Sequence, residues 1–328
     1  MREKKKAVIL EAAAVSPGDL SWAPVTALCD TVLFDNTTEE EKWDRIRDAE
    51  LVLTNKVIID EAVLAQFPSI KYIGVCATGY NVVDLDAAAK RGIPVTNVPA
   101  YSTDSVAQHT FALLLDLASK ITMHAQSVKN GDWTRVNTFC YWNAPIIEIH
   151  GKTLGIYGFG HIGKEVAAIA KCFGMRVLVY TAHPEKYRSY EDSRLQFTDA
   201  DTLFRNSDFI TLHCPQTKET TGLICSETIE KMKQGVILIN VARGGLVNEQ
   251  DLAGALKSGR IGGAGLDVIG HEPMQPDHPL LEAPNLLITP HIAWATIEAR
   301  TRLIETVGAN IRAWMEGAPQ NVVNAHLL

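Results

Sequence analysis

Short apolar runs alternate with amphipathic stretches along the first third of the chain. The apolar runs are rich in Val and Ile and are predicted to be strands, at 7–10, 31–34, 51–54, 70–76 and 93–98. Helices are predicted at 60–66 and 84–91, where Asp60 and Asp84 are expected to cap the helix N-termini. Because the strands are apolar throughout, they are expected to form a parallel sheet that helices cover on both faces.

A second alternation of strands and helices begins at Gly151. Its six predicted strands lie at 153–158, 176–181, 208–213, 236–241, 261–268 and 286–289. Helices are predicted between them, at about 161–173, 199–206, 226–233 and 249–258. Strands joined in this way by crossover helices are typical of a doubly wound nucleotide-binding domain.

Two long helices flank this second alternation. Residues 103–128 contain few helix breakers and are predicted to form one long helix, which an aromatic-rich loop at 132–150 follows. The helix predicted at 295–315 is expected to return to the first domain. The chain is therefore predicted to be an α/β protein of two doubly wound parallel-sheet domains, a flavodoxin-like one from 1–101 plus 294–328 and a Rossmann domain at 102–293.

Composition narrows the class of protein. Hydrophobic residues make up 46% and charged residues 21% of the 328 residues, which excludes intrinsic disorder. The net charge of -7 argues against a nucleic-acid-binding surface. No apolar run approaches the ~18 residues that a membrane-spanning helix needs. The lysines and apolar residues at the start resemble a signal peptide, but Glu11 interrupts the apolar run, and a first buried strand is predicted instead.

The cysteines are scattered along the chain. None of the six forms a C-x-x-C pair, and no histidines cluster near them, so neither a disulfide framework nor a metal site is predicted. This pattern fits a protein of the reducing cytoplasm.

A glycine-rich segment joins the first strand of the second alternation to its first helix. In G-F-G-H-I-G, the residues Gly158, Gly160 and Gly163 have the spacing of a dinucleotide-binding turn. The first glycine permits the tight turn, the second lets the backbone approach a pyrophosphate, and the third lets the helix pack on the strand. His161 and Ile162 fill the variable positions at the helix start, where backbone amides favour an anion.

The second strand of this domain ends at Thr181, where a carboxylate often binds the ribose 2'-hydroxyl of NAD. Without that carboxylate nothing repels a 2'-phosphate, and His183, Lys186 or Arg188 could bind one. Alternatively, Thr181 hydrogen-bonds the ribose and the basic residues are solvated. NAD and NADP both remain open, with NAD(H) slightly favoured.

Three chemically active side chains follow strands of the second domain: Arg243, Glu272 and His291. The crevice outside the carboxyl ends of parallel strands is where such sheets bind ligands. Histidine exchanges a proton near neutral pH, and a neighbouring carboxylate stabilises its charged form. Arginine offers paired donors that match a carboxylate. Together they suit the reduction of a 2-oxo acid, in which a hydride reaches carbon and a proton reaches oxygen.

The chain resembles the D-isomer-specific 2-hydroxyacid dehydrogenase family over essentially its full length. The motifs that match in order and spacing are G-F-G-H-I-G, N-V-A-R-G-G-L-V-N, G-A-G-L-D-V and T-P-H-I-A-W-A-T. The stretches C-A-T-G-Y-N-V-V-D and N-V-P-A-Y-S-T-D-S-V-A-Q-H-T are most similar to the glycerate dehydrogenase (hydroxypyruvate reductase) branch.

The resemblance implies a role for each matching residue. His291 corresponds to the acid/base histidine, Glu272 to the carboxylate that orients it, and Arg243 to the substrate-binding arginine. Asp267 corresponds to a residue near the nicotinamide carboxamide. Further expected cofactor contacts are Cys214, Pro215, Val241 and Ala242. The expected contacts to the substrate are Asn55, Lys56, the backbone amides at Thr78 and Gly79, and Arg243.

The resemblance also implies a central cofactor domain, a substrate domain built from both chain termini, and a homodimer joined through the cofactor domain. The expected reaction converts hydroxypyruvate to D-glycerate, and also reduces glyoxylate, with NAD(P)H. D-lactate or another D-2-hydroxy acid remains an alternative, as does an NAD(H)-sensing module without turnover. A formate-type dehydrogenase is disfavoured because that group carries an amide where Glu272 stands. A phosphoglycerate dehydrogenase with a C-terminal regulatory domain is disfavoured because the chain ends at Leu328. No nucleic-acid or membrane partner is expected.

Overall fold

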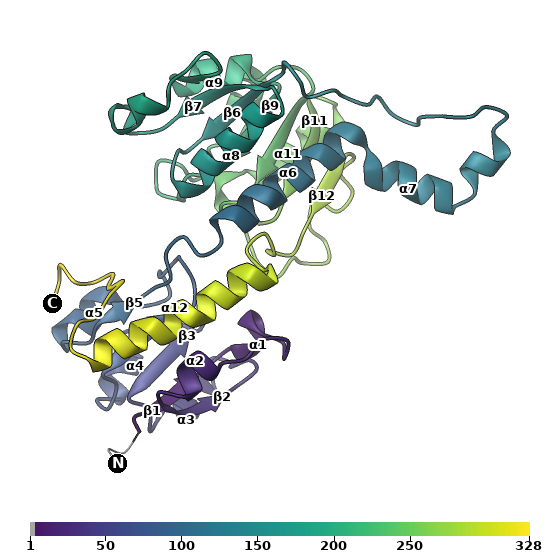
Figure 1. The fold of residues 1–328 in the computed structure, drawn as a ribbon. Helices are drawn as coiled ribbons and strands as arrows, with labels where there is room; N and C mark the ends of the chain where they lie inside the picture. Colours follow the sequence, from purple (N-terminus) through teal and green to yellow (C-terminus); the bar gives the residue numbers. More distant parts are fainter. Residues whose placement is uncertain (1–3) are drawn as a thin grey trace. The chain divides into compact units, whose positions relative to one another are not determined.

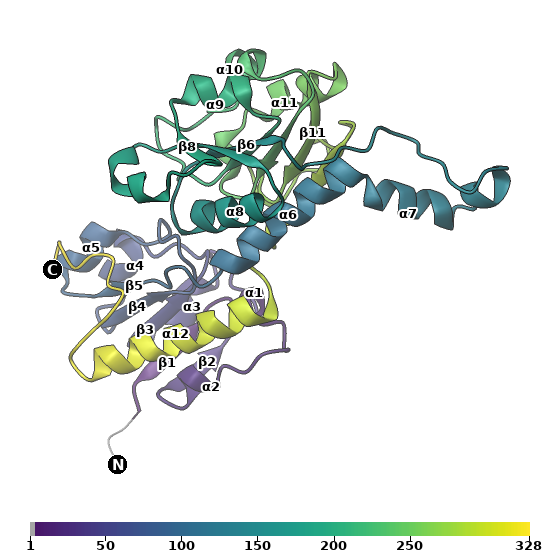
Figure 2. The ribbon, with the colours of Figure 1, turned by 45° about the horizontal axis from the view of Figure 1, so that its top comes forward.

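A computed structural model describes residues 4–328. The chain divides into two compact units, one built from Met1–Ser102 and Ala295–Leu328 and the other from Thr103–Trp294. Figures 1 and 2 show the elements of each unit from two directions. Residues 1–3, which the predicted first domain includes, lie outside the described residues. The predicted α/β class with two parallel sheets is confirmed.

The sheet of the first unit has the strand order β2-β1-β3-β4-β5, and all its pairs are parallel. The strands are β1 (Lys6–Ile9), β2 (Asp30–Leu33), β3 (Leu51–Thr54), β4 (Tyr72–Val75) and β5 (Val95–Thr96). The order of a flavodoxin-like sheet changes direction between β1 and β3, and such a switch point opens a crevice at the strand ends. The loops after β3 and β4 lie at that edge.

Among the described residues, the first unit contains six helices, and two of them begin at the Asp caps that the sequence predicts. They are α1 (Ala12–Val15), α2 (Ala23–Thr26), α3 (Lys42–Ile46), α4 (Glu61–Gln66), α5 (Leu85–Lys90) and α12 (Ile297–Met315). Asp60 and Asp84 accept hydrogen bonds from backbone N–H groups in the first turns of α4 and α5. The α12 helix, yellow in Figure 1, belongs to this unit. Its Arg300 makes paired hydrogen bonds to Asp19, of 2.8 and 2.6 Å.

The second unit contains a seven-stranded parallel sheet in the order β12-β11-β10-β9-β6-β7-β8. The strands are β6 (Thr153–Tyr157), β7 (Arg176–Tyr180), β8 (Leu195–Phe197), β9 (Phe209–Leu212), β10 (Val236–Asn240), β11 (Ile261–Leu266) and β12 (Leu286–Ile288). The sequence prediction of six strands was wrong because it missed β8. This edge strand has three residues and only one of them is buried, so it shows no apolar run.

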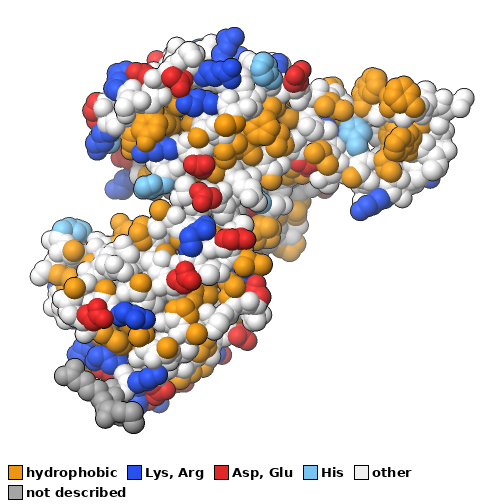
Figure 3. Space-filling model, in the orientation of Figure 1, with side chains coloured by type: hydrophobic (Ala, Val, Ile, Leu, Met, Phe, Trp, Pro, Cys, Tyr) orange, Lys and Arg blue, Asp and Glu red, His pale blue; other side chains and the backbone are white. Residues whose placement is uncertain are grey.

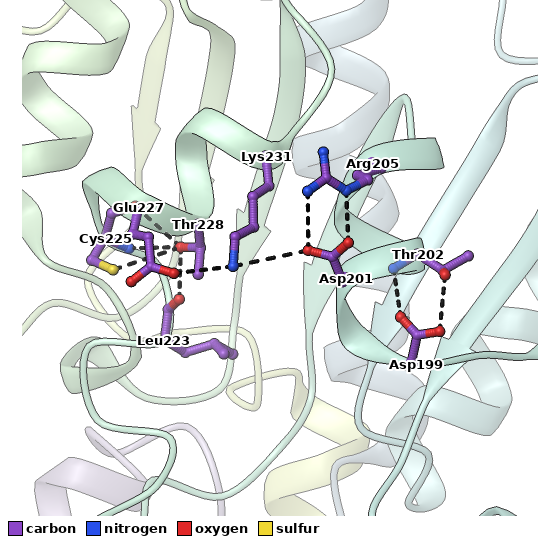
Figure 4. A network of polar contacts seen from close by, with 9 residues as sticks. All are labelled: Asp199, Asp201, Thr202, Arg205, Leu223, Cys225, Glu227, Thr228 and Lys231. Carbon is purple, nitrogen blue, oxygen red and sulfur yellow. Dashed lines mark hydrogen bonds and ion pairs between the residues drawn. The ribbon is translucent and has the colours of Figure 1, made fainter.

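Helices cover both faces of this sheet. They are α6 (Thr103–Ser119), α8 (His161–Cys172), α9 (Ala200–Asn206), α10 (Ser226–Lys231) and α11 (Glu249–Lys257). The helix α7 (Ile121–Lys129) extends away from the sheet, and the unit also contains the short 3-10 turns η1 (Asp132–Arg135), η2 (Pro184–Tyr190) and η3 (Gly244–Leu246). One apolar cluster joins α6 and α8 to the sheet, and another joins α9, α10 and α11 to it. Polar contacts tie α9 to α10 at the surface, where Lys231 lies 3.9 Å from Asp201 and 3.1 Å from Glu227 (Figure 4).

The prediction of one unbroken helix over 103–128 was wrong at a single residue. Lys120 adopts a left-handed conformation with φ of 55° and separates α6 from α7. The side chain of Asp116 accepts a hydrogen bond from the Thr122 N–H (2.7 Å), which satisfies a donor at the start of α7. The break depends on the backbone conformation of one residue and on one side-chain contact. Hydrophobic periodicity along the sequence shows neither of them. Within residues 4–328, no helix is both long and apolar enough to cross a bilayer.

Candidate active site

The three glycines of the predicted dinucleotide turn lie between β6 and α8, and each meets a different environment. A Cβ at Gly158 would lie 2.6 Å from the backbone of His213, and one at Gly163 would lie 2.3 Å from the Gly158 carbonyl oxygen. Gly158 also has a φ of +104°. A Cβ at Gly160, in contrast, would meet nothing within 4 Å. The turn therefore leaves open space only at the position where a pyrophosphate would approach the start of α8, and it fits a dinucleotide.

The other predicted cofactor residues follow strands on both sides of the point where the sheet order reverses, between β6 and β9. His161 and Ile162 begin α8, and Thr181 follows β7. Cys214 and Pro215 come after β9, and Val241 and Ala242 come after β10. The buried side chain of Asn240 orders this last loop, since it accepts from the Ala242 N–H (3.1 Å) and donates to the Arg243 carbonyl (2.8 Å). All of these residues thus share the carboxyl edge of one sheet.

His213 is a residue at this edge that the sequence analysis missed. Its Nε2 lies 2.8 Å from the Thr211 hydroxyl, and its buried Nδ1 has no hydrogen-bond partner among the described residues. The residue as a whole is partly accessible, but burial of the ring lowers the pKa of His213 to about 3. The ring is therefore neutral at physiological pH. Its position directly before Cys214 at a strand end was the available signal.

The segment that carries the candidate phosphate-binding side chains is fixed beside the glycine turn by aromatic contacts. The rings of Tyr187 and Tyr190 in η2 meet Phe159 edge-on at 5.4 and 5.5 Å. Lys164 Nζ lies 4.8 and 5.1 Å from the same two tyrosine rings.

Two of the three basic candidates already have carboxylate neighbours. His183 Nδ1 lies 3.3 Å from Glu185, and Arg188 lies 3.4 Å from Glu191. In the part of the chain that the structure describes, Lys186 is the candidate that forms no ion pair, and it is exposed. Of the three, Lys186 therefore has the most freedom to approach a 2'-phosphate.

His291 and Glu272 form a close pair. His291 Nδ1 lies 2.7 Å from Glu272 Oε2, and their side chains are 31% and 34% exposed. The second carboxylate oxygen of Glu272 accepts a hydrogen bond from the Ile269 N–H (3.3 Å). Because the carboxylate engages Nδ1, Nε2 is the ring nitrogen left to exchange a proton with a ligand. The structure thus brings together two of the three residues predicted to be catalytic.

The loop that carries His291 is anchored by Asp267. This buried carboxylate accepts hydrogen bonds from the Thr289 hydroxyl (2.6 Å) and from the N–H groups of Ile292 and Ala293 (both 2.8 Å). His291 itself has a φ of 56°, a conformation that costs a non-glycine residue energy and needs such support. The side chain of Asp267, for which the resemblance implies a place near the nicotinamide, therefore has an anchoring role that the sequence did not reveal.

Arg243 lies after β10 and directly precedes η3. Its guanidinium is exposed and donates to the neighbouring Ala242 carbonyl (2.6 Å). The strands β10, β11 and β12 are adjacent and parallel, so Arg243, Glu272 and His291 come after three neighbouring strand ends. This is the edge at which an open α/β sheet binds its ligand.

The predicted substrate contacts Asn55, Lys56, Thr78 and Gly79 belong to the first unit. They follow the adjacent strands β3 and β4, and the Asn55 side chain donates to the Cys76 carbonyl (3.1 Å), which joins the two loops. Lys56 and Thr78 are exposed, and the Thr78 hydroxyl donates to the Val98 carbonyl (3.0 Å).

Glu11 orders the first of these loops, a role that was not predicted from the sequence. Its buried carboxylate accepts hydrogen bonds from the N–H groups of Asn55 (2.9 Å), Lys56 (2.7 Å) and Val57 (2.8 Å). It also accepts from the Thr54 hydroxyl (3.2 Å). An acidic residue directly after a buried strand was the signal.

A dinucleotide turn, a seven-stranded doubly wound sheet and a histidine–carboxylate pair at its ligand-binding edge define a nicotinamide-dependent oxidoreductase. The family model described as "D-isomer specific 2-hydroxyacid dehydrogenase, NAD binding domain" matches residues 111–293. The chain belongs to the D-isomer-specific 2-hydroxyacid dehydrogenase family and is an NAD(P)-dependent enzyme that acts on 2-oxo acids.

Curated relatives align over most of this chain. The hydroxypyruvate reductase of Blautia hydrogenotrophica is 44% identical over 322 residues, which cover 97% of this chain and 99% of the relative. The glycerate dehydrogenase of Methylorubrum extorquens is 43% identical, over 88% of this chain and 90% of the relative. The crystal structure of D-lactate dehydrogenase from Aquifex aeolicus with NAD and lactic acid matches with a TM-score of 0.83 and 31% identity, over 96% of each chain. The resemblance to the family seen in the sequence is confirmed.

Proposed function

We propose that this enzyme reduces hydroxypyruvate to D-glycerate with NAD(P)H, and glyoxylate as a second substrate. The observation that carries the proposal is the 2.7 Å contact between His291 and Glu272 at the carboxyl edge of a dinucleotide-binding sheet. It is supported by the high identity, over nearly the whole chain, to a hydroxypyruvate reductase and a glycerate dehydrogenase.

His291 acts as the proton donor in this mechanism. NAD(P)H held in the second unit would supply the hydride for the carbonyl carbon. Protonated His291 donates the proton on Nε2 to the carbonyl oxygen. Glu272 accepts the hydrogen bond from Nδ1 and stabilises the imidazolium before transfer. The neutral imidazole is then reprotonated from solvent. Arg243 pairs with the substrate carboxylate and stabilises negative charge on the carbonyl oxygen.

Each unit has its own task. The domain from 1–101 plus 294–328 is the substrate domain, in which Asn55, Lys56 and the backbone amides at Thr78 and Gly79 bind the substrate carboxylate. The domain at 102–293 holds the dinucleotide. The cofactor contacts in it are Gly158, Gly160, His161, Ile162, Gly163, Thr181, Cys214, Pro215, Val241, Ala242 and Asp267.

The working enzyme is a homodimer joined through the cofactor domain, and its location is the cytoplasm. The dimer is supported by the exposed apolar side chains that follow α6, Phe139 and Trp142 among them. The location is supported by six free cysteines at separate sites.

The experiment is a kinetic comparison of hydroxypyruvate, glyoxylate and pyruvate with NADH and NADPH. Hydroxypyruvate should give the highest kcat/KM, and His291→Ala should lower kcat by about 10²- to 10⁴-fold with unchanged cofactor affinity. His326→Ala, at an exposed histidine, is the matched control. A preference for pyruvate would favour the D-lactate alternative, and a His291→Ala variant with full turnover would contradict the assigned chemistry.

A further inference from the structure

Glu272 lies on a segment between β11 and β12 that has no regular secondary structure. Its carboxylate must nevertheless remain within hydrogen-bond distance of His291 for the pair to work. Within the segment, the contact from the Ile269 N–H to Glu272 is long, at 3.3 Å. Any other contact that fixes this segment would therefore also fix the position of Glu272 relative to His291.

Glu249 supplies two such restraints. It is the first residue of α11, and its Oε1 accepts a hydrogen bond from the Gly270 N–H (2.7 Å). Its Oε2 lies 3.0 Å from His278 Nε2. One carboxylate thus holds both ends of the segment from 270 to 278, and Glu272 lies between them.

The hydrogen bonds of His278 define its tautomer. His278 Nδ1 accepts from the Leu280 N–H (3.3 Å), so Nε2 carries the hydrogen and donates it to Glu249. The side chains of His278 and Glu249 are 9% and 20% exposed, and water competes little for this contact. The Glu249 carboxylate also packs closely against Gly270, at the other end of the segment. A Cβ at Gly270 would lie 3.3 Å from it.

We propose that Glu249, together with His278, is a positioning residue that holds Glu272 against His291. Neither residue touches the reacting atoms. The inference rests on the proposed function, because it takes Glu272 and His291 as the acid/base pair. It differs from a purely structural role for Glu249 at the start of α11, where a carboxylate would also stabilise the helix.

A double-mutant cycle with Glu249→Gln and Glu272→Gln separates these two roles. The Glu249 carboxylate accepts from two donors, the Gly270 N–H and the His278 Nε2–H. Glutamine at 249 presents an NH₂ group to one of these donors, and that contact is lost. Glu249→Gln alone should lower kcat about tenfold and leave the KM for NAD(P)H nearly unchanged. In the Glu272→Gln background, the same substitution should lower kcat less than about twofold, because the carboxylate it positions is gone.

Two further variants keep the test independent of folding defects. His278→Gln retains an amide donor toward Glu249 and should keep most of the turnover, whereas His278→Leu should behave like Glu249→Gln. Glu227→Gln is the matched control, since Glu227 lies in the first turn of α10 and its exposed side chain pairs with the surface Lys231 (Figure 4). It should retain wild-type kcat.

The outcomes distinguish the inference from the proposed function. Wild-type kcat in Glu249→Gln, or equal losses in both backgrounds, would overturn the positioning role. If Glu272→Gln itself kept full turnover, the proposed acid/base pair would fail instead.

Discussion

At the scale of single residues, the cofactor edge of the second unit is built from buried polar groups with defined partners. The side chains of Asn240 and Asp267 satisfy backbone groups of the loops that carry Arg243 and His291. A buried polar group without a partner costs stability, so these contacts restrict each loop to one arrangement. His213 differs, because its Nδ1 has no partner among residues 4–328 and its pKa is lowered to about 3 by burial.

His213 should therefore make the protein less stable in acid. Between its folded pKa of about 3 and the ordinary histidine value of 6.5, the unfolded chain binds a proton that the folded chain does not. Stability then falls as the pH falls, by at most about 1.4 kcal/mol per pH unit from this group. His213→Gln should reduce the decrease in Tm between pH 7 and pH 4.5, as measured by calorimetry. His326→Gln is the control at an exposed histidine, and parallel curves for His213→Gln and the wild type would contradict this assignment.

At the scale of elements, short strands deliver loops to the ligand-binding edge, and side chains from other elements give those loops their shape. The loop after β3 is ordered by Glu11, which directly precedes α1. The pairing of β1 with β3 brings the two segments together, although they lie far apart in the sequence.

Replacing Glu11 with glutamine should destabilise the first unit. The amide has one acceptor oxygen where the carboxylate has two, so at least one N–H among Asn55, Lys56 and Val57 loses its partner. The expected decrease in the free energy of unfolding is about 1–3 kcal/mol, measured by urea denaturation. Glu61→Gln, which removes an exposed ion pair with Arg91, should change it little. Equal effects of the two substitutions would show that Glu11 does not order the loop.

At the scale of the whole molecule, the second unit bears an arm formed by α7, η1 and the loop that follows, which extends away from its sheet in Figures 1 and 2. Apolar side chains gather on it in Figure 3. Its exposed apolar residues are Ile121, Met123, Val128, Trp133, Val136, Phe139, Trp142 and Ile146. The loop is fixed on α7 by polar contacts, such as the one from the Tyr141 hydroxyl to Ser127 (3.0 Å). An ordered apolar surface of this kind is typical of a protein–protein interface.

The arm is expected to join two copies of the chain, and charges on it should separate them. Phe139, which is 89% exposed, and Trp142, which is 67% exposed, are the residues to replace. The wild type should sediment as a dimer, and the double variant Phe139→Asp/Trp142→Asp should sediment as a monomer. Ile58→Asp places a charge on an exposed apolar residue of the first unit and should leave the dimer intact. A monomeric wild type, or a double variant that remains dimeric, would contradict the proposed interface.

Much of the fold was predictable because its signals are local. The apolar runs locate all the strands except β8, and the Asp60 and Asp84 caps mark two helix starts correctly. The glycine spacing at 158–163 is also local: Gly158 and Gly163 each have no room for a Cβ, Gly160 leaves open space, and all three lie within a single strand–turn–helix. The positions of Arg243, Glu272 and His291 after strands are equally visible along the chain.

The remaining features depend on contacts between distant segments, which no local pattern records. Glu11 binds a loop more than forty residues away, Asp267 anchors the His291 loop, and Glu249 holds both ends of the Glu272 segment. Hydrophobic periodicity determined which residues form strands and helices, because burial follows from side-chain spacing within each element. Only the folded sheet decided which polar atoms meet at its edge, because strand order brings together groups that the chain itself keeps apart.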